Sequence, residues 1–189
     1  MKNRTKNPSS IFRSAIFSML LIIAFSFQSC DTEIPPTDTD PPNFSLKITG
    51  EGFDHIFNQD DDFSSFELNL TEDALYDFIF SASDPDGLKS AQMQFPGDHF
   101  EIETDLPTTW ISRFNNGIST SVTWRGDVNN PVTGAILNGK FRVSGDNLAF
   151  GLLLDVRDYG GEAGTSNQTF AELNIDVGQQ DTEIHYYSE

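Results

Sequence analysis

The strongest constraint on the fold is an alternation of apolar and polar side chains from Phe44 onward. Apolar residues recur at every second position in runs at 44–48, 66–70, 76–82, 91–95, 100–102, 118–124, 136–143, 148–156 and 170–177. A period of two places successive side chains on opposite faces of a β-strand, whereas a helix repeats every 3.6 residues. Gly, Asn, Asp and Pro residues separate the runs, as they do at turns between strands. The pattern predicts an all-β chain whose antiparallel strands form a sandwich or a barrel.

Three short segments add detail to this pattern. Residues 71–75 (TEDAL) predict a single helical turn capped by Thr71. Asn138-Gly139 predicts either a hairpin turn or a bulge within its run. The final segment from Ile184 to Tyr187 is apolar enough to add a strand, to pack on the surface or to fray. The chain also has 17 Phe residues, which would fill the space between two sheets.

The charge balance excludes some classes of partner. The chain has 29 acidic and 11 basic residues, and four of the basic ones lie within the first 13 positions. A surface this negative repels phosphate backbones, so we expect no nucleic-acid partner and no docking on anionic lipid by charge. The acidity is explained either by solubility or by binding of a divalent cation, which needs clustered carboxylates. The single cysteine, Cys30, excludes an internal disulfide.

Residues 1–29 have the parts of an export signal. A basic start with Lys2, Arg4 and Lys6 precedes an apolar stretch, AIFSMLLIIAFSF, at 15–27. This stretch is short for a bilayer of about 30 Å, so it indicates a signal peptide rather than a stable membrane span. Ser29-Cys30 after such a stretch resembles the lipobox of bacterial lipoproteins, although Phe27 and Gln28 depart from its commonest pattern. The alternative is an ordinary secretory signal followed by a chance cysteine.

The lipobox resemblance implies that the signal peptide 1–29 is removed and that Cys30 is lipidated. Several acyl chains anchor a protein durably where one does not. Residues 30–43, with four prolines and four acidic residues after Cys30, predict a flexible tether. The folded domain is expected at 44–178, followed by a tail at 179–189. We expect an exported protein anchored by lipid to the bacterial outer membrane, at the cell surface.

Two stretches resemble the cadherin-like and bacterial immunoglobulin-like β-sandwiches. At 78–95 (FIFSASDPDGLKSAQMQF), a strand ends in Ala-x-Asp-x-Asp-Gly and a second alternating strand follows. At 152–177, a strand is followed by an Asp-x-Gly turn, a loop rich in Ser and Thr, and a final strand. The resemblance implies an immunoglobulin-like antiparallel sandwich. It covers under half of the domain, and the Leu-Asp-Arg-Glu motif of calcium-binding cadherins is absent from the sequence.

The same resemblance implies a possible calcium site. By position, Asp84 and Asp86 match the Asp-x-Asp pair of that family, Asp158 matches its later Asp-x-Gly turn, and Asp38 and Asp40 stand for its linker carboxylates. Calcium takes six to eight oxygen ligands, so we expect either no cofactor or weak calcium binding. The alternative is that Asp84 and Asp86 only cap a tight turn before Gly87.

No motif for catalysis is present, and we expect a non-enzyme. A Gly-x-Ser-x-Gly elbow is absent, as is His-x-x-x-His zinc spacing. Trp110 and Trp124 offer either a glycan-stacking platform or core packing. Two functions stay open: a binding, adhesion or envelope-assembly module with an unknown protein partner, or a glycan-binding accessory lipoprotein for polysaccharide capture.

Overall fold

The computed structural model describes residues 34–35, 38–115, 117–145, 147–160 and 165–187, and these form two β-sheets. The predicted signal peptide and Cys30 lie outside the described residues. Within the described ranges no helix has the length and apolarity needed to span a bilayer.

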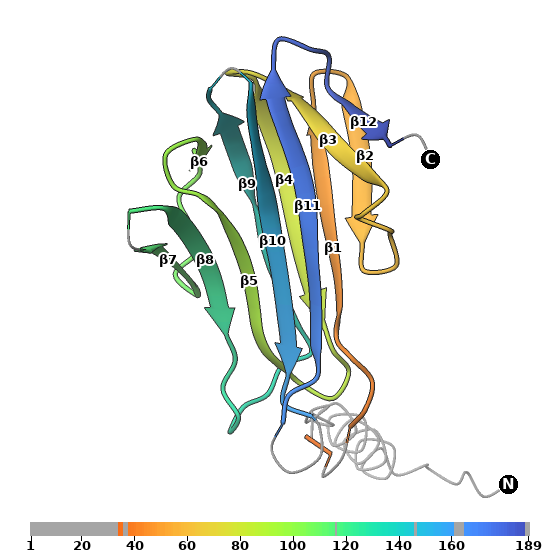
Figure 1. The fold of residues 1–189 in the computed structure, drawn as a ribbon. Helices are drawn as coiled ribbons and strands as arrows, with labels where there is room; N and C mark the ends of the chain where they lie inside the picture. The colour runs from red at the N-terminus through yellow and green to blue at the C-terminus, as the bar shows by residue number, and fades with distance from the viewer. Residues whose placement is uncertain (1–33, 36–37, 116, 146, 161–164, 188–189) are drawn as a thin grey trace, which may run out of the picture. The chain divides into compact units, whose positions relative to one another are not determined.

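The first sheet has five strands, all joined to their neighbours in antiparallel fashion. Their order across the sheet is β2 (Phe53–Asn58), β1 (Asn43–Gly50), β4 (Leu75–Ser83), β9 (Gly134–Val143) and β6 (Phe100–Ile102). This sheet lies behind the other in Figure 1.

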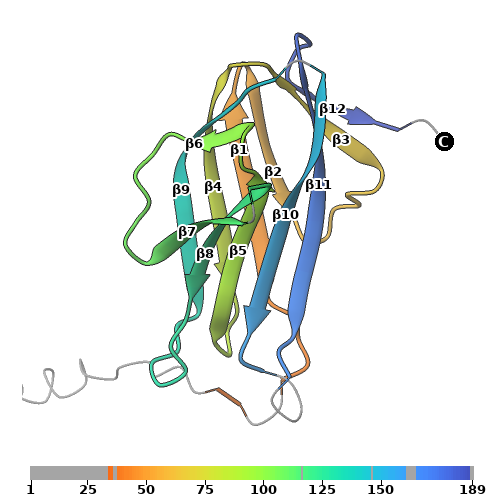
Figure 2. The ribbon, with the colours of Figure 1, turned by 60° about the vertical axis from the view of Figure 1, so that its left-hand side comes forward.

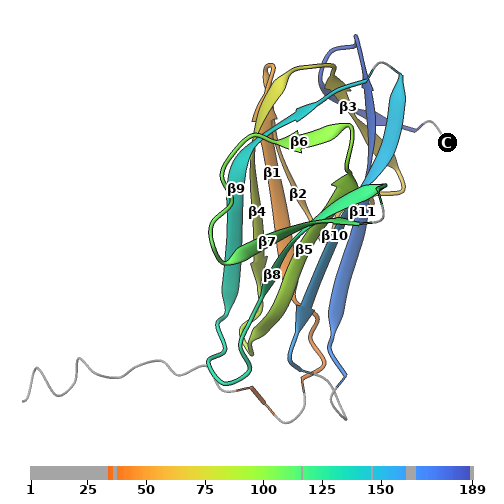
Figure 3. The ribbon, with the colours of Figure 1, turned by 90° about the vertical axis from the view of Figure 1, so that its left-hand side faces the viewer.

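The second sheet has seven strands and faces the viewer in Figure 1. Their order is β12 (Glu183–Tyr186), β3 (Phe66–Thr71), β11 (Gln168–Gly178), β10 (Leu148–Asp158), β5 (Leu88–Pro96), β8 (Ser119–Arg125) and β7 (Trp110–Asn115). Every pair is antiparallel except β3 and β11, which run parallel. Figure 3 shows the two sheets edge on, and together they form the predicted all-β sandwich.

The alternating apolar residues form the core between the sheets. The fully buried side chains include Leu46, Phe80 and Leu137 from the first sheet, and Leu68 and Leu154 from the second. Aromatic rings fill much of one end of this space, through two stacked pairs. The ring centroids of Phe100 and Phe141 are 4.5 Å apart, and those of Tyr76 and Phe141 are 5.3 Å apart.

Two local expectations are corrected by the structure. No helical turn forms at 71–75: Thr71 ends β3, its Oγ1 donates to the Gln180 carbonyl, and Asp73 turns the chain with a φ of 58°. Asn138 and Gly139 are neither a hairpin turn nor a bulge, because both lie within β9 and pair in unbroken register with β4. A Cβ at Gly139 would lie 3.1 Å from the Phe78 ring, so the glycine allows close packing.

Three strands add to the predicted set. β2 and β7 were not predicted, and the C-terminal tail supplies β12, which pairs with β3. The tail therefore adds a strand, which is one of its three expected outcomes. Figure 2 shows the side of the sandwich where the chain crosses from β6 in one sheet to β7 in the other.

The segment just before β1 is attached to the sandwich rather than free. The Asn167 side-chain amide donates to the main-chain oxygens of Asp38, at 3.0 Å, and Asp40, at 3.4 Å. Thr169 Oγ1 donates to the Pro42 carbonyl. The expectation of a flexible tether is therefore corrected for residues 38–42, because these hydrogen bonds fix them to the end of the domain.

Candidate metal site

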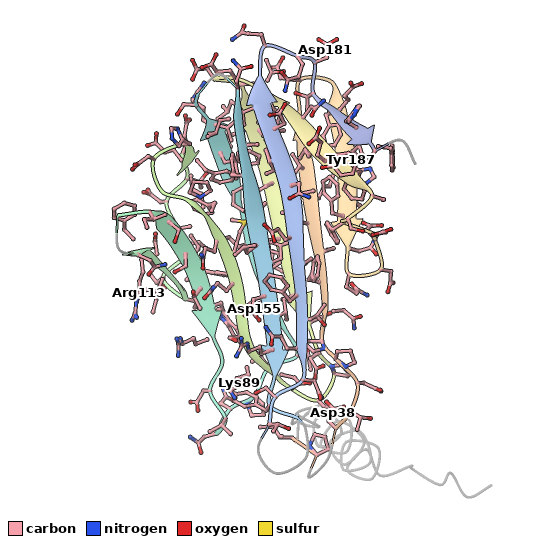
Figure 4. The ribbon with its side chains drawn as sticks, in the orientation of Figure 1. Asp38, Lys89, Arg113, Asp155, Asp181 and Tyr187 are labelled. Atoms are coloured by element: carbon pink, nitrogen blue, oxygen red, sulfur yellow. The ribbon has the colours of Figure 1, made fainter. Side chains whose placement is uncertain are left out.

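Three aspartates from distant parts of the sequence meet at one end of the sandwich. Asp84 directly follows β4, Asp158 is the last residue of β10, and Asp38 lies just before β1. The ends of β4 and β10 point toward the same end of the domain, where Figure 4 labels Asp38. The topology therefore brings together residues that are 46 to 120 positions apart in the chain.

The three carboxylates are close enough to share one ion. One oxygen from each lies within 4.8 Å of the other two. Calcium–oxygen bonds are about 2.3–2.6 Å long, so two ligands of one ion are at most about 5 Å apart. The three side chains are also buried, with Asp38 7% exposed, Asp84 2% and Asp158 0%. Among the described residues this is the only such group of potential metal ligands.

One oxygen of the cluster has no partner. Asp38 Oδ1 accepts a hydrogen bond of 2.9 Å from the amide of Asp40, whereas Asp38 Oδ2 is buried and accepts none from the described residues. A buried carboxylate oxygen without a donor is costly, and such atoms are rare in folded proteins. A bound cation would supply the missing partner.

Glycine at position 160 makes room for this carboxylate. A Cβ on Gly160 would lie 2.5 Å from the Cβ of Asp38 and 2.6 Å from its Oδ2. Any side chain at position 160 would therefore push Asp38 away from the other two aspartates. The glycine follows Asp158 by two positions, which matches the Asp-x-Gly turn in the sequence.

Asn167 holds two of the aspartates in place. Its main-chain N–H donates to Asp158 Oδ1 and its side-chain amide to Asp158 Oδ2, both at 2.8 Å. The same side-chain amide donates to the main-chain oxygen of Asp38. Asn167 therefore orients Asp158 and positions Asp38 beside it, as the outer partners of a metal site orient its ligands. Sequence reasoning missed Asn167, because its role has no local pattern. The Asp-x-Gly turn contained Gly160 but gave no sign that this glycine makes room for Asp38.

The cluster is electrostatically unbalanced. Burial raises the pKa of Asp84 to about 6, and repulsion from Asp158 and Asp38 adds to this effect against a hydrogen bond from the Asp86 amide. Burial also raises the pKa of Asp158, with repulsion from Asp38, although the hydrogen bonds of Asn167 oppose the shift. None of the four ion pairs among the described residues involves these aspartates. Either a proton or a metal ion would relieve the repulsion.

The donor set fits a hard divalent cation. Three carboxylates supply three of the six to eight oxygens that calcium takes, and main-chain carbonyls or water would supply the others. No histidine or cysteine belongs to the cluster, so zinc and other soft metals fit poorly. Calcium would accept the carboxylates without any strict geometry, whereas magnesium demands a near-ideal octahedron.

The other two predicted aspartates lie outside this cluster. Asp86 is half-buried and donates its amide to Asp84 Oδ1 at 2.8 Å, so it belongs to the turn. Asp40 is exposed and donates its amide to Asp38. Asp84 therefore caps the turn before Gly87 and also contributes to the cluster. The two interpretations of this motif are compatible.

The two tryptophans do not form an exposed platform. Trp110 is 5% exposed, belongs to the core, and donates from Nε1 to the Ile136 carbonyl at 3.1 Å. Trp124 pairs with Trp110 in the sheet register and packs, partly buried, against the same core. Both rings therefore belong to the packing between the sheets, which corrects the expectation of a glycan-stacking site at these residues.

Comparisons with known proteins give structural likeness only. No family model matches the sequence, and no curated protein matches it. A cohesin module of a family 33 glycoside hydrolase from Clostridium perfringens is 9% identical, with a TM-score of 0.40 over 75% of this chain and 100% of that one. A non-cellulosomal cohesin from Archaeoglobus fulgidus is 14% identical, with a TM-score of 0.35 over 60% of this chain and 89% of that one. Sandwich folds serve many functions, so what this chain binds has to be argued from its own residues.

Proposed function

We propose that this chain is an exported, non-catalytic binding module of the bacterial cell envelope, anchored by lipid on Cys30. The observation that carries the proposal is the attachment of residues 38–42 to the sandwich through Asn167 and Thr169. Asp38 lies only eight positions after Cys30. Since an extended chain spans at most about 3.6 Å per residue, an anchored Cys30 holds this end of the sandwich within roughly 30 Å of the membrane. The opposite end and both sheet faces are then presented away from the lipid.

The chemistry of the aspartate cluster supports a binding role better than a catalytic one. Its three carboxylates are buried and lie beside an asparagine that is already committed to hydrogen bonds. A hydrolase of the glycosidase type would instead need two carboxylates with room for a substrate between them. In our proposal the cluster binds calcium weakly, with a millimolar dissociation constant of the kind seen in extracellular modules. The ion fixes the segment that leads to the lipid.

The test combines lipid labelling with accessibility. Cells expressing the wild type or Cys30→Ala are labelled with an alkyne fatty acid and then treated, intact, with protease. We expect label in the wild type only, and loss of the wild-type protein on protease treatment. Absence of label from the wild type would overturn the anchor. Label with full protection from protease would place the module inside the envelope rather than at the cell surface.

A second candidate function is capture of a glycan. The outer face of the seven-stranded sheet favours it, because side-chain amides, hydroxyls and guanidinium groups gather there in a groove. This candidate no longer depends on Trp110 or Trp124.

A further inference from the structure

A groove runs across the outer face of the seven-stranded sheet. The register of β10, β5, β8 and β7 aligns outward side chains in rows. The rows are Asp155–Gln92–Thr123–Ile111, Leu153–Gln94–Ser121–Arg113 and Arg157–Ser90–Arg125. Two hollows of about 720 and 240 Å³ lie over these rows, and both are lined by Gln92, Thr123 and Arg125. The two hollows adjoin at these three residues, and together they are called the groove below.

The basic residues of the folded chain are concentrated in this groove. Only seven Lys and Arg residues follow position 13. Four of them, Lys89, Arg113, Arg125 and Arg157, line the two hollows. The other three, Lys47, Lys140 and Arg142, lie on strands of the five-stranded sheet and pair with Asp54, Asp77 and Glu103. After position 13 the chain has 29 acidic residues against these seven basic ones, and four of the seven lie on one face.

Two of these cations have no partner among the described residues. Arg157 pairs with Asp155, and Lys89 donates to Ser166 Oγ at 2.6 Å. The guanidinium groups of Arg113 and Arg125 are exposed and make neither a hydrogen bond nor an ion pair within the described ranges. Figure 4 shows Arg113 projecting from the β7 side of the sheet, with Asp155 and Lys89 on the same face.

The two carboxylates that line the groove are already engaged. Asp155 accepts from Arg157 and from the Gln168 amide, at distances of 3.0 to 3.1 Å. Asp127 accepts from Asn129. The free hydrogen-bonding capacity of the groove is therefore mainly that of donors, and the guanidinium groups favour an anionic ligand.

We propose that this groove binds an oligosaccharide that carries carboxylate groups, such as a chain of uronic acid residues. Guanidinium groups pair with carboxylates through two parallel hydrogen bonds, and amides and hydroxyls suit the hydroxyls of a sugar ring. The lining between Arg113 and Arg125 is made of such groups, including Gln92, Gln94 and Thr123. The centres of protein–protein interfaces are enriched in aromatic and Met side chains. The smaller hollow has only Ile111 and the larger one adds Val128 and Tyr159, so polar and charged groups make up most of the lining.

The acidic surface around the groove disfavours a long ligand of high negative charge density. Exposed charges more than about 8 Å apart are largely screened at physiological ionic strength, so the groove acts on its ligand through its own cations. A nucleic acid carries one charge per roughly 1.7 Å of duplex, and it would extend into the acidic surroundings. A short uronate chain, with one carboxylate on each sugar, fits within the groove.

This inference rests on the proposed binding function and names its ligand class. The test is calorimetric titration of the purified protein with tetragalacturonate and with its methyl ester, which keeps the sugar shape and removes the charge. We expect binding of the free acid, at least tenfold weaker binding of the ester, and weaker binding at high salt. Arg113→Gln and Arg125→Gln should each weaken binding about tenfold. Lys140→Gln, which removes the same charge from the five-stranded sheet, should bind like the wild type.

Each other outcome overturns the inference. Equal binding of acid and ester would show that the ligand's carboxylates are not recognised. Wild-type affinity in both arginine variants would show that the ligand does not bind in the groove. Stronger binding of poly-glutamate than of the sugar would identify an acidic peptide as the ligand. Absence of binding would also reject the inference. If fatty-acid label and protease sensitivity are kept in that case, the proposed function stands with a different ligand.

Discussion

Replacing Asp84 with Asn tests whether the aspartate cluster is a strained cation site. A rise in the pKa of Asp84 from 3.8 to about 6 means that its ionised form is disfavoured in the folded protein. At about 1.4 kcal/mol per pKa unit, the upper limit of this cost is roughly 3 kcal/mol, and screening by solvent and ions reduces it. Asn keeps the oxygen that accepts from the Asp86 amide. Without metal at pH 7.5, the variant should therefore gain about 1–3 kcal/mol in free energy of unfolding.

Calcium should stabilise the wild type but not Asp84→Asn. A ligand present at ten times its dissociation constant stabilises the folded state by about 1.4 kcal/mol. For a domain of this size, that corresponds to a rise of about 3–6 °C in Tm. We expect this rise in the wild type and none in Asp84→Asn, because the variant has lost a charged ligand.

The assay is thermal unfolding followed by circular dichroism, with chelator and at 10 mM calcium. Asp62→Asn is the matched control, because exposed Asp62 also accepts a main-chain amide two residues ahead but lies in the loop between β2 and β3. The control should respond to calcium like the wild type. A variant at position 84 that is less stable than the wild type in chelator, or that keeps the full calcium response, would refute the reasoning.

Three further predictions follow from the same structure. Gly160→Ala should abolish the calcium-dependent rise in Tm, because its Cβ would displace the Asp38 carboxylate; an unchanged rise would show that Asp38 is not a ligand. Between about pH 4 and pH 6, without calcium, Asp84 is protonated in the folded state and ionised in the unfolded chain. The free energy of unfolding of the wild type therefore falls as pH rises through this range. The difference in unfolding free energy between wild type and Asp84→Asn should therefore widen over that range, and a constant difference would contradict the raised pKa. Tyr76→Phe should lower the free energy of unfolding by about 1–2 kcal/mol and speed hydrogen exchange in β12, because the buried Tyr76 hydroxyl lies 2.5 Å from Thr182 Oγ1 just before that strand. Unchanged exchange would show that this contact does not hold β12 in place.

Alternation predicted the strands that face the core on one side and solvent on the other. It failed for β2 because His55 lies on the inner side with Phe53 and Phe57, and Ile56 lies on the outer side at 52% exposure. The pattern is also weak in β7, an edge strand where most side chains are exposed whichever way they point. Apolar alternation reflects which side chains are buried, so it does not predict strands whose burial pattern is irregular.

The candidate sites differ in how far the sequence could predict them. Asp84 and Asp158 were named from recognisable turns and Asp38 from the resemblance to a linker carboxylate, and the structure brings these three together. Asp40 and Asp86 share the same motifs but serve the turns, since side-chain direction depends on the folded backbone. The groove could not be predicted, because Gln92, Thr123 and Arg125 become neighbours only through the pairing of β5 with β8.

The placement of β1 in the five-stranded sheet has a mechanical consequence. The strand forms ladders with β2 on one side and β4 on the other, over six and seven residue pairs, and the chain enters it directly from Asp38. A pull on the N-terminal segment runs along the axis of β1, so both ladders are loaded in shear and their hydrogen bonds resist together. The aspartate cluster lies ahead of them and takes the load first. Resistance to forced unfolding depends on the unfolding rate, so an ion in the cluster would lengthen the lifetime of the domain under tension.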